Sequence, residues 1–431
     1  MQGNLYSGSA GRRSKIVFVN RFYWPDESAT GQLLTDLAEH MARNGSDVTV
    51  VTSRLHYSSA DQKLEGAGQR NGVNIHRVWT TAYDRSSMLG RLLDLVTFNL
   101  FAMLALIRIL RAGDIVVAKT DPPFIQLFAF MAARLRRAKL VNWCQDLFPE
   151  VAYALMKQSH FSGYRSLLSA ARNFALRRAD YTVAISKEMR LTLLHQGIHR
   201  DRVLVINNWC DRQITPIPKD ENTLRDKWHL QDDFVIGYSG NLGRAHVPES
   251  VYRLVQELAG IPKLKMLFIG AGHGMTWLQQ QCRAEGFDHV VFQPYQSRRD
   301  LSLSLSAPDI HLISLRSGCQ KFIAPSKFYG ILAAGRPVAF IGDLDSDMAK
   351  DIYRSRFGLT LSPNRIGDWR QSIMNVMQND NELAMMSRNA RQAFDWRFAP
   401  STSLEAWQRV LEKTTAQPEF PHEKTVVTAT Q

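Results

Sequence analysis

Apolar residues along this chain alternate between short continuous runs and longer stretches with helical spacing. Two of the short runs, residues 15–20 and 47–52, have the length of strands. Between them, a stretch that opens at Gly31 carries apolar residues three and four positions apart and ends at Asn44 and Gly45. A strand, a helix and a second strand in this order predict a βαβ unit. Such units build parallel sheets covered on both faces by helices.

The same alternation continues in two series. The first has further strand-length runs at residues 114–118, 139–143, 181–185 and 203–206. Residues 211–233 then break the pattern with two prolines and a charged stretch. The second series has runs at residues 234–238, 265–269, 290–292, 310–313 and 338–341. The pattern predicts an α/β fold with two Rossmann-like doubly wound domains facing across a cleft, and ligands at the carboxyl ends of the strands.

The predicted boundaries follow from these breaks. We expect disordered tails at residues 1–14 and 414–431, a first domain at 15–210, a linker at 211–232 and a second domain at 233–395. A C-terminal helix at 396–413 completes the chain, and packing back on the first domain is one arrangement open to it.

Composition is that of an ordinary globular protein. Of its residues, 45% are hydrophobic and 22% are charged. A chain of 431 residues is long enough for two large domains with full cores. The four cysteines are scattered without close pairs, a pattern that argues against a disulfide framework or a zinc site and favours a reducing compartment. The first fifteen residues contain no apolar core, so we do not expect a secretory signal there.

The net charge of +13 allows nucleic acid, an anionic membrane or an anionic substrate as partner. Basic residues flank strongly apolar runs at 92–110 and 124–135, which favours an anionic membrane surface over nucleic acid. Run 92–110 is close to the length of a membrane span, yet Asp94 and Asn99 interrupt it. Spanning is therefore the less favoured interpretation, and a helix packed on a sheet stays as open as membrane contact.

The stretch APSKFYGILAAGRP at residues 324–337 predicts a small apolar helix at 328–334. Pro325 suits the first helical position and Gly335 the residue just past the end. Ser326 and Lys327 would then stand at the helix start, where N–H groups and a cation form a site for phosphate. A capped core helix with nothing bound is the plainer alternative.

A second phosphate-binding candidate is the sequence GYSGNLGR, which follows the first strand of the second series. Gly240, Asn241 and Gly243 predict a flexible turn with exposed N–H groups, and Arg244 adds a charge that could grip a diphosphate. We expect this turn and Lys327 to open onto one cleft. The later turn GAGHG, which contains Gly272, could equally be a packing feature.

The first domain offers candidate residues for a second substrate. The loop at 20–31 lacks the Gly-x-Gly-x-x-Gly fingerprint, which weakens an oxidoreductase interpretation. Thr30 and Gly31 would let a ligand approach a helix start, or Thr30 would simply cap that helix. Asp146 and Glu150 follow a strand and could be an acid/base pair, acceptor-binding groups or helix-start carboxylates, with Asp121 expected nearby.

Taken together, DLFPE, SGNLGR and PSKFYGILAAGRP, in that order, resemble the retaining glycosyltransferases of family 4, which have the GT-B fold. The chain looks most like the bacterial branch that builds exopolysaccharide and O-antigen chains on a polyprenyl-diphosphate carrier. The resemblance covers roughly residues 15–413.

The resemblance implies transfer of a sugar, with retention, from a UDP- or GDP-sugar to a lipid-linked glycan acceptor. It implies no required metal or cofactor, and a peripheral location at the cytoplasmic face of the inner membrane. The implied catalytic residues are Arg244, Lys327 and Asp146. The donor would be bound in the second domain by Gly240, Asn241, Gly243, Arg244, Gly272, Ser326 and Lys327. The acceptor would be bound in the first domain by Thr30, Gly31, Asp121, Asp146 and Glu150.

The chain departs from the wider family at two acidic positions. The paired glutamates of that family would fall at Phe322 and Gly330, neither of which is acidic. The family's usual arginine and lysine pair is also incomplete, because no lysine closely follows Arg244. Lys327 is the predicted substitute for that lysine. Two alternatives therefore stay open. One is a sugar-nucleotide epimerase of the same architecture, and the other is a non-catalytic nucleotide-sugar-binding protein.

Overall fold

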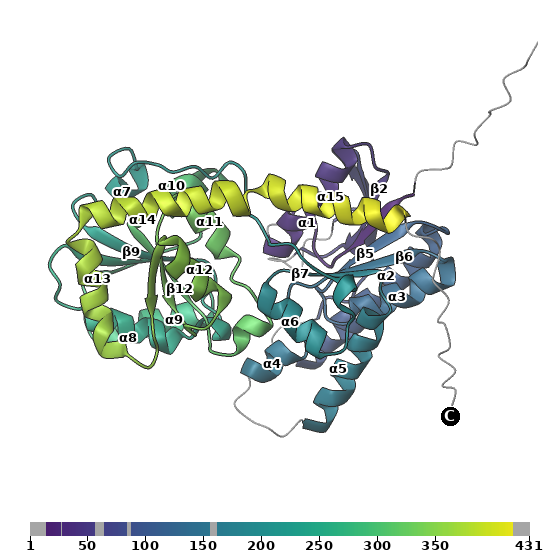
Figure 1. Cartoon of the computed structure of the whole chain (residues 1–431), viewed down its shortest axis with the longest axis horizontal. Coiled ribbons are helices and arrows are strands. Elements are labelled where there is room, and N and C mark those ends of the chain that lie inside the picture. The colour runs from purple at the N-terminus through teal and green to yellow at the C-terminus, as the bar shows by residue number, and fades with distance from the viewer. Residues whose placement is uncertain (1–13, 27, 57–63, 84–87, 156–161, 417–431) are drawn as a thin grey trace, which may run out of the picture. The chain divides into compact units, whose positions relative to one another are not determined.

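The computed structural model describes residues 14–26, 28–56, 64–83, 88–155 and 162–416 (Figure 1). Packing divides these residues into two compact units. The first is drawn from residues within 1–144, 171–183 and 406–431, and the second from residues within 145–170 and 184–405. Of the tails predicted at 1–14 and 414–431, all but residues 14 and 414–416 lie outside the described ranges.

The first sheet has the strand order β3-β4-β2-β1-β5-β6-β7-β8. Its strands are β1 (Ile16–Val19), β2 (Val48–Ser53), β3 (Ala67–Arg70), β4 (Val73–Val78), β5 (Ile115–Lys119), β6 (Lys139–Trp143), β7 (Tyr181–Ala184) and β8 (Val203–Val205). The central strand β1 pairs in parallel with β2 and with β5, as a βαβ topology requires. Every residue of β1, β2, β5 and β6 is buried, which explains their continuous apolar runs.

The hairpin of β3 and β4 was not predicted. These strands are antiparallel and meet at Asn71 and Gly72, both of which have positive φ angles, of 46° and 82°. Because an Asn-Gly pair favours the two-residue turn of a hairpin, the sequence did carry a signal for it. β3 is mostly exposed and lacks an apolar run, so the hydrophobic pattern alone does not reveal it.

The helices that accompany the first sheet lie close to the predicted stretches, except α5, which was not predicted. They are α1 (Ala29–Arg43), α2 (Met88–Ile109), α3 (Ile125–Arg136), α5 (Ser162–Arg177) and α15 (Pro400–Ala416). α1 begins at Ala29 rather than Gly31, because the Ser28 hydroxyl caps it by accepting the N–H of Gly31 at 3.2 Å. Thr30 is therefore not the capping residue.

The second sheet is entirely parallel and has the strand order β11-β10-β9-β12-β13-β14. Its strands are β9 (Phe234–Ser239), β10 (Leu264–Ile269), β11 (Val290–Gln293), β12 (Ile310–Ser314), β13 (Val338–Ile341) and β14 (Gly358–Leu361). Alternate residues point to opposite faces. Met266 and Phe268 of β10 join one hydrophobic cluster, whereas Leu267 and Ile269 join another. β14 was not predicted, since it is short and begins with a glycine.

Apart from α5, the described residues have ten α-helices between Glu150 and Ala393, all within the second unit. They are α4 (Glu150–Leu155), α6 (Lys187–His195), α7 (Thr223–Lys227), α8 (Pro248–Leu258), α9 (His273–Ala284), α10 (Leu301–Ser306), α11 (Lys327–Ala333), α12 (Asp347–Ser355), α13 (Trp369–Met377) and α14 (Asp380–Ala393). Two sheets accompanied by helices, one entirely parallel and one parallel except for its β3 edge strand, confirm the predicted pair of Rossmann-like domains.

The segment predicted as a linker at 211–232 is partly built into the second unit. Leu224 of α7 and Trp228, just after it, pack in one cluster with Val235 of β9. Arg225 is buried and donates to the carbonyl oxygen of Ala307 at 2.6 Å. The prolines and charges suggested an irregular connection, but apolar residues among them are enough to fix a short helix on the sheet.

Candidate functional site

Helix α11 places the Pro-Ser-Lys turn beside the glycine turn after β9. The helix starts at Lys327 with Ser326 as its N-cap residue, so Pro325 precedes the helix and does not occupy its first position. The Ser326 side chain makes no capping hydrogen bond and the residue is exposed. At the other end Gly335 has a φ angle of +62° just past the C-cap, as predicted.

The Lys327 ammonium group lies buried without an anionic partner. Its Nζ atom is 3.6 Å from the centroid of the Tyr238 ring and has no hydrogen-bond partner among the described residues. Burial lowers the pKa of Lys327 well below its ordinary value of 10.5, because the charged form loses hydration. Buried lysines are usually paired with an anion. A buried lysine without such a partner therefore indicates a site where a bound anion would be stabilised.

The glycine turn after β9 lies against this ammonium group. Gly240 has a φ angle of +115°, and a Cβ atom added there would lie 3.7 Å from the Lys327 Nζ atom. Its N–H donates to the carbonyl oxygen of Ile269 at 2.8 Å, which fixes the turn on β10. The structure thus brings Gly240 and Lys327 together, although 87 positions separate them in the sequence.

Arg244 extends this cluster toward solvent. It opens a short 3-10 helix (Arg244–His246), its side chain is exposed, and its carbonyl oxygen accepts from the Arg316 guanidinium at 3.3 Å. Burial, and then the charge of Lys327, lower the pKa of His246 to about 4. His246 is therefore neutral at pH 7, and its Nδ1–H donates to the carbonyl oxygen of Ser314 at 2.8 Å.

The GAGHG turn serves first as a packing partner of the same glycine turn. A Cβ atom at Gly270 would lie 2.4 Å from the carbonyl oxygen of Gly240, and one at Gly272 would lie 2.0 Å from the side-chain oxygen of Asn241. Leu242 N–H also donates to the carbonyl oxygen of Ala271 at 3.1 Å. Two backbones can approach this closely only where glycine stands.

In the first unit, Thr30 and Asp121 meet as a half-buried polar pair. The Thr30 hydroxyl donates to Asp121 Oδ2 at 2.8 Å, and the Lys119 ammonium donates to the Thr30 carbonyl oxygen at 2.6 Å while lying 3.8 Å from the Trp143 ring centroid. Burial raises the pKa of Asp121, an effect that the Thr30 hydrogen bond and the Lys119 charge oppose. Two predicted acceptor residues are thus joined at the ends of α1 and β5.

The other predicted acceptor residues differ in availability. The Gly31 N–H is already used by Ser28, as described above. Glu150 is buried, and its Oε1 accepts from the Ser169 hydroxyl at 3.1 Å and from the Gln196 amide at 3.0 Å. Asp146 is exposed. Asp146 and Glu150 belong to the second unit, whereas Thr30 and Asp121 belong to the first.

The two positions at which the wider family carries glutamates have other roles in this chain. The Phe322 carbonyl oxygen accepts the N–H of Leu147 at 3.0 Å. Gly330 is buried in α11, and an added Cβ atom would lie 3.2 Å from a methyl carbon of Leu305. Core packing therefore fills the space that a side chain at position 330 would need. Within the described ranges, no cluster of three His, Cys, Asp or Glu residues could hold a metal ion.

Sequence reasoning missed several residues of these clusters. His246 and Tyr238 flank Lys327, yet a single histidine and a strand tyrosine carry no pattern that points to a ligand. Lys119 is the last residue of the apolar strand β5. Because ligands of parallel sheets bind at the carboxyl ends of the strands, this position was a sequence signal for a functional residue.

Comparison with known proteins agrees with this architecture. Residues 29–209 match the family described as Glycosyl transferase 4-like domain, and residues 220–393 match Glycosyl transferases group 1. Together the two matches span most of the chain. It belongs to the family 4 glycosyltransferases. This enzyme therefore has the GT-B fold that its sequence suggested.

Relatives of this glycosyltransferase are named for polysaccharide biosynthesis. It is 25% identical, over 74% of its length and 81% of the relative, to a protein of Escherichia coli (strain K12) named as the colanic acid biosynthesis glycosyl transferase WcaI. It is 26% identical to the glycosyltransferase WbjE of Pseudomonas aeruginosa, over 59% of its own chain and 64% of that protein.

Solved structures share the fold at lower identity. Anabaena Alr3699/HepE, solved in complex with UDP-glucose, superposes with a TM-score of 0.67 at 16% identity over 93% of this chain and 99% of that one. WaaG, described as a glycosyltransferase involved in lipopolysaccharide biosynthesis, gives a TM-score of 0.66 at 14% identity over 91% and 99% of the two chains. At these identities the likeness concerns the fold.

Proposed function

We propose that this glycosyltransferase moves a sugar, with retention of anomeric configuration, from a UDP- or GDP-sugar to a polyprenyl-diphosphate-linked glycan. The reaction would contribute to a bacterial surface polysaccharide. The observation that carries the proposal is the Lys327 ammonium group, which is buried without an anion beside the Gly240 turn. A diphosphate bound there would supply the missing partner, and Arg244 stands four residues along the same turn to bind its outer oxygens.

The chemistry follows from where charge develops. When the bond between the anomeric carbon and the diphosphate oxygen breaks, negative charge accumulates on the departing nucleotide diphosphate. Fixed cations beside that oxygen stabilise the transition state more than the ground state. In the proposed reaction the leaving phosphate takes the proton of the attacking acceptor hydroxyl, and the new bond forms on the face that the diphosphate leaves. This route needs no carboxylate at positions 322 and 330.

Two of the comparisons support the proposed substrates. A nucleotide sugar as donor accords with the UDP-glucose complex of HepE, and surface polysaccharide synthesis accords with the name of WcaI. The acceptor roles predicted for Thr30, Asp121 and Asp146 stay predictions. The half-buried Thr30–Asp121 pair is the better placed to hold an acceptor hydroxyl, since Glu150 is buried and already accepts two hydrogen bonds.

The decisive experiment is a screen of UDP- and GDP-sugars against polyprenyl-diphosphate-linked acceptors, with the product followed by mass and its anomeric configuration by NMR. We expect one donor to be used, and Lys327→Ala to reduce its turnover at least 100-fold. Lys350→Ala is the matched control, because Lys350 is an exposed lysine of the same unit. Near-normal turnover in Lys327→Ala, or a product of inverted configuration, would contradict the proposal.

We further propose that the enzyme lies on the cytoplasmic face of the inner membrane through the outer side of α2. By length and composition alone, residues Leu89–Ile109 would suffice to cross a bilayer. Large apolar side chains nevertheless remain exposed along one side of this helix, namely those of Leu89, Leu92, Leu93, Val96, Leu100 and Phe101. Trp79 is half-exposed and its ring lies 5.2 Å from that of Phe101, and tryptophan favours the headgroup level of a membrane.

The inner side of α2 supports an orientation along the membrane rather than across it. Phe98 and Leu106 are buried in the core of the first unit. Asp94 is also buried, accepts from the Thr81 hydroxyl at 2.6 Å, and lies 3.6 Å from the Arg21 guanidinium. Crossing a bilayer would require breaking these polar contacts. Exposed arginines of α2 and α3, such as Arg108 and Arg134, could meet anionic headgroups.

Vesicle flotation tests this orientation. We expect binding to vesicles that contain phosphatidylglycerol, little binding to pure phosphatidylcholine, and clear loss of binding in Leu92→Glu and Val96→Glu. Leu191→Glu is the control, because Leu191 is a half-exposed leucine on α6. Equal flotation of all three variants would refute the role of α2, whatever the outcome of the donor screen.

A further inference from the structure

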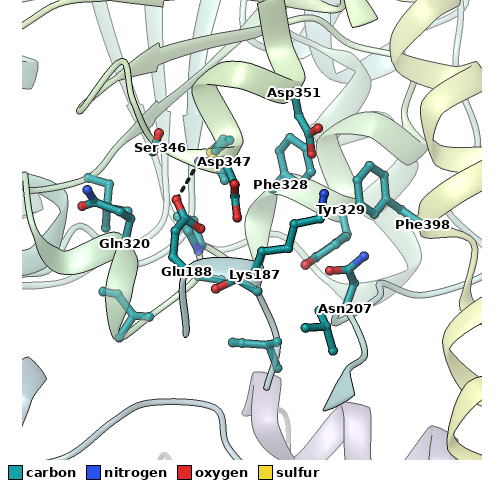
Figure 2. Close-up of a pocket in the computed structure, with 18 of the residues that line it drawn as sticks. Lys187, Glu188, Asn207, Gln320, Phe328, Tyr329, Ser346, Asp347, Asp351 and Phe398 are labelled. Carbon is teal, nitrogen blue, oxygen red and sulfur yellow. Dashed lines mark hydrogen bonds between the residues drawn. The ribbon is translucent and has the colours of Figure 1, made fainter. Parts of the chain in front are cut away.

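The second unit contains a cavity that Phe328 and Tyr329 of α11 line and Lys327 does not. Its volume is about 130 Å³. The start of α6, the loop before α11, the start of α12 and the segment that contains Phe398 contribute to its wall (Figure 2). None of the predicted donor or acceptor residues lines it.

Helix α11 directs two kinds of side chain to different neighbours. Lys327 lies over Tyr238, as described above. Phe328 and Tyr329 instead pack on Phe398, with ring centroids 5.4 and 5.7 Å away. These three aromatic residues give the cavity an apolar wall (Figure 2). A ligand in the cavity would therefore contact aromatic carbon rather than the lysine that we assign to the diphosphate.

Two carboxyl groups meet at one side of the cavity. Glu188 Oε1 accepts the backbone N–H of Asp347 at 2.6 Å, a contact drawn in Figure 2. The Oδ2 atom of Asp347 is buried and has no hydrogen-bond partner among the described residues. Burial is the main cause that raises the pKa of Glu188, to about 7, and the neighbouring Asp347 carboxylate raises it further through a side-chain hydrogen bond and its charge. Near neutral pH Glu188 can therefore donate as well as accept.

Groups of the opposite kind line the cavity elsewhere. Lys187 and Asn207 extend toward Tyr329 in Figure 2 and carry N–H donors. Asp351 is less available, because its Oδ2 atom accepts from Arg397 at 2.9 Å. The cavity thus combines an aromatic wall, a buried acceptor without a partner and several donors around a space too small for a nucleotide.

This combination fits one chemical class best. A neutral pyranose ring has a face of C–H groups that packs on aromatic rings, and hydroxyl groups that both donate and accept. A divalent cation is disfavoured, since no cluster of three ligating side chains occurs in the described part of the chain. A lipid tail is disfavoured because it would offer no hydrogen-bond partner to the polar side chains that line the cavity, among them Asn207, Gln320 and Asp347.

We propose that this cavity is a subsite for a neutral pyranose, namely a sugar residue of the acceptor glycan that does not itself react. The inference rests on the proposed function, because only a glycan acceptor supplies such a second sugar. The hydroxyl groups of the pyranose donate to Asp347 and accept from Lys187 or Asn207. Its C–H face packs on the aromatic wall of Phe328 and Phe398. Binding away from the reacting centre would help to hold the acceptor in place.

Saturation-transfer NMR on the full-length enzyme tests the subsite. The probes are the methyl glycosides of glucose, galactose, mannose and N-acetylglucosamine, each measured with UDP in saturating excess so that the donor site is filled. We expect transfer to at least one glycoside. We also expect at least fivefold weaker transfer in Asp347→Asn, which removes the acceptor charge, and loss of transfer in Val205→Phe, which fills the cavity from β8.

Controls separate a lost subsite from a damaged protein. Asp345→Asn alters an exposed carboxylate two residues away that does not line the cavity, and should bind the glycoside normally. All variants should keep the UDP affinity of the wild type, measured by calorimetry. Wild-type enzyme that binds UDP but no glycoside, or undiminished transfer in both cavity variants, would overturn this inference alone. Failure to bind any nucleotide would instead count against the proposed function.

Discussion

Replacing Lys327 by methionine should make the folded enzyme more stable and nearly inactive. The Lys327 Nζ atom is buried and lacks a hydrogen-bond acceptor within the described residues. Leaving a buried polar group unsatisfied costs about 1–3 kcal/mol, and more for a charged group. The cation–π contact with Tyr238 at 3.6 Å offsets about 0.5–2 kcal/mol of this cost. Methionine has a similar length and needs no partner, so we expect a net stabilisation of about 1 kcal/mol.

The pH dependence gives this prediction a second readout. In the unfolded chain Lys327 has its ordinary pKa of 10.5, whereas burial lowers the pKa in the folded enzyme. Between the lowered pKa and 10.5 the unfolded chain therefore binds more protons than the folded one. The free energy of unfolding of the wild type must rise with pH across this window. The stability advantage of Lys327→Met should accordingly shrink as pH approaches 10.

Scanning calorimetry of the full chain at pH 7 and pH 9.5 measures both effects. A gain of about 1 kcal/mol corresponds to a rise in Tm of about 2–4 °C for a unit of this size. UDP affinity, measured in parallel, should fall about 10- to 100-fold, because charge-assisted hydrogen bonds to phosphate are lost. Lys350→Met is the control and should change neither quantity. A lower Tm for Lys327→Met at pH 7, or unchanged UDP affinity, would refute the reasoning.

Three further predictions concern single residues. Arg244→Ala should lower kcat/KM for the donor about 10- to 100-fold with little change in Tm, because Arg244 is exposed; an unchanged kcat/KM would remove its role. Trp407→Ala should cost about 3–5 kcal/mol of stability by denaturant titration, since this fully buried ring packs 4.8 Å from that of Trp143. Arg225→Met should cost a similar amount, as it leaves Asp309 and the Ala307 carbonyl oxygen without a cation; a cost below 1 kcal/mol would contradict this.

The sequence was sufficient for most of the architecture. Central parallel strands are buried on both faces, so β6 and β13 appear as unbroken apolar runs and were predicted with their observed bounds. The edge hairpin of β3 and β4 was missed, because an exposed strand has no apolar run to detect. α7 was missed because prolines and charges outweighed Leu224 and Trp228 in the pattern.

The candidate site was predictable in part. The proximity of Lys327 to Gly240 was anticipated, because loops after neighbouring parallel strands of one sheet meet at one edge. The burial of Lys327 was not, since it depends on Tyr238 and His246 lying around the ammonium group. Likewise Glu150 seemed available from its position after a strand, whereas its partners Ser169 and Gln196 come from distant helices.

The brevity of α11 has a consequence for how two substrates would sense one another. Seven residues form a single rigid piece that touches the proposed diphosphate site through Lys327 and the proposed sugar cavity through Phe328 and Tyr329. A displacement of this piece by one ligand cannot leave the other site unchanged. Thermodynamic linkage then requires that donor and glycan alter each other's affinity by the same factor. An ordered or synergistic binding of the two substrates would thus originate in α11, a helix of less than two turns.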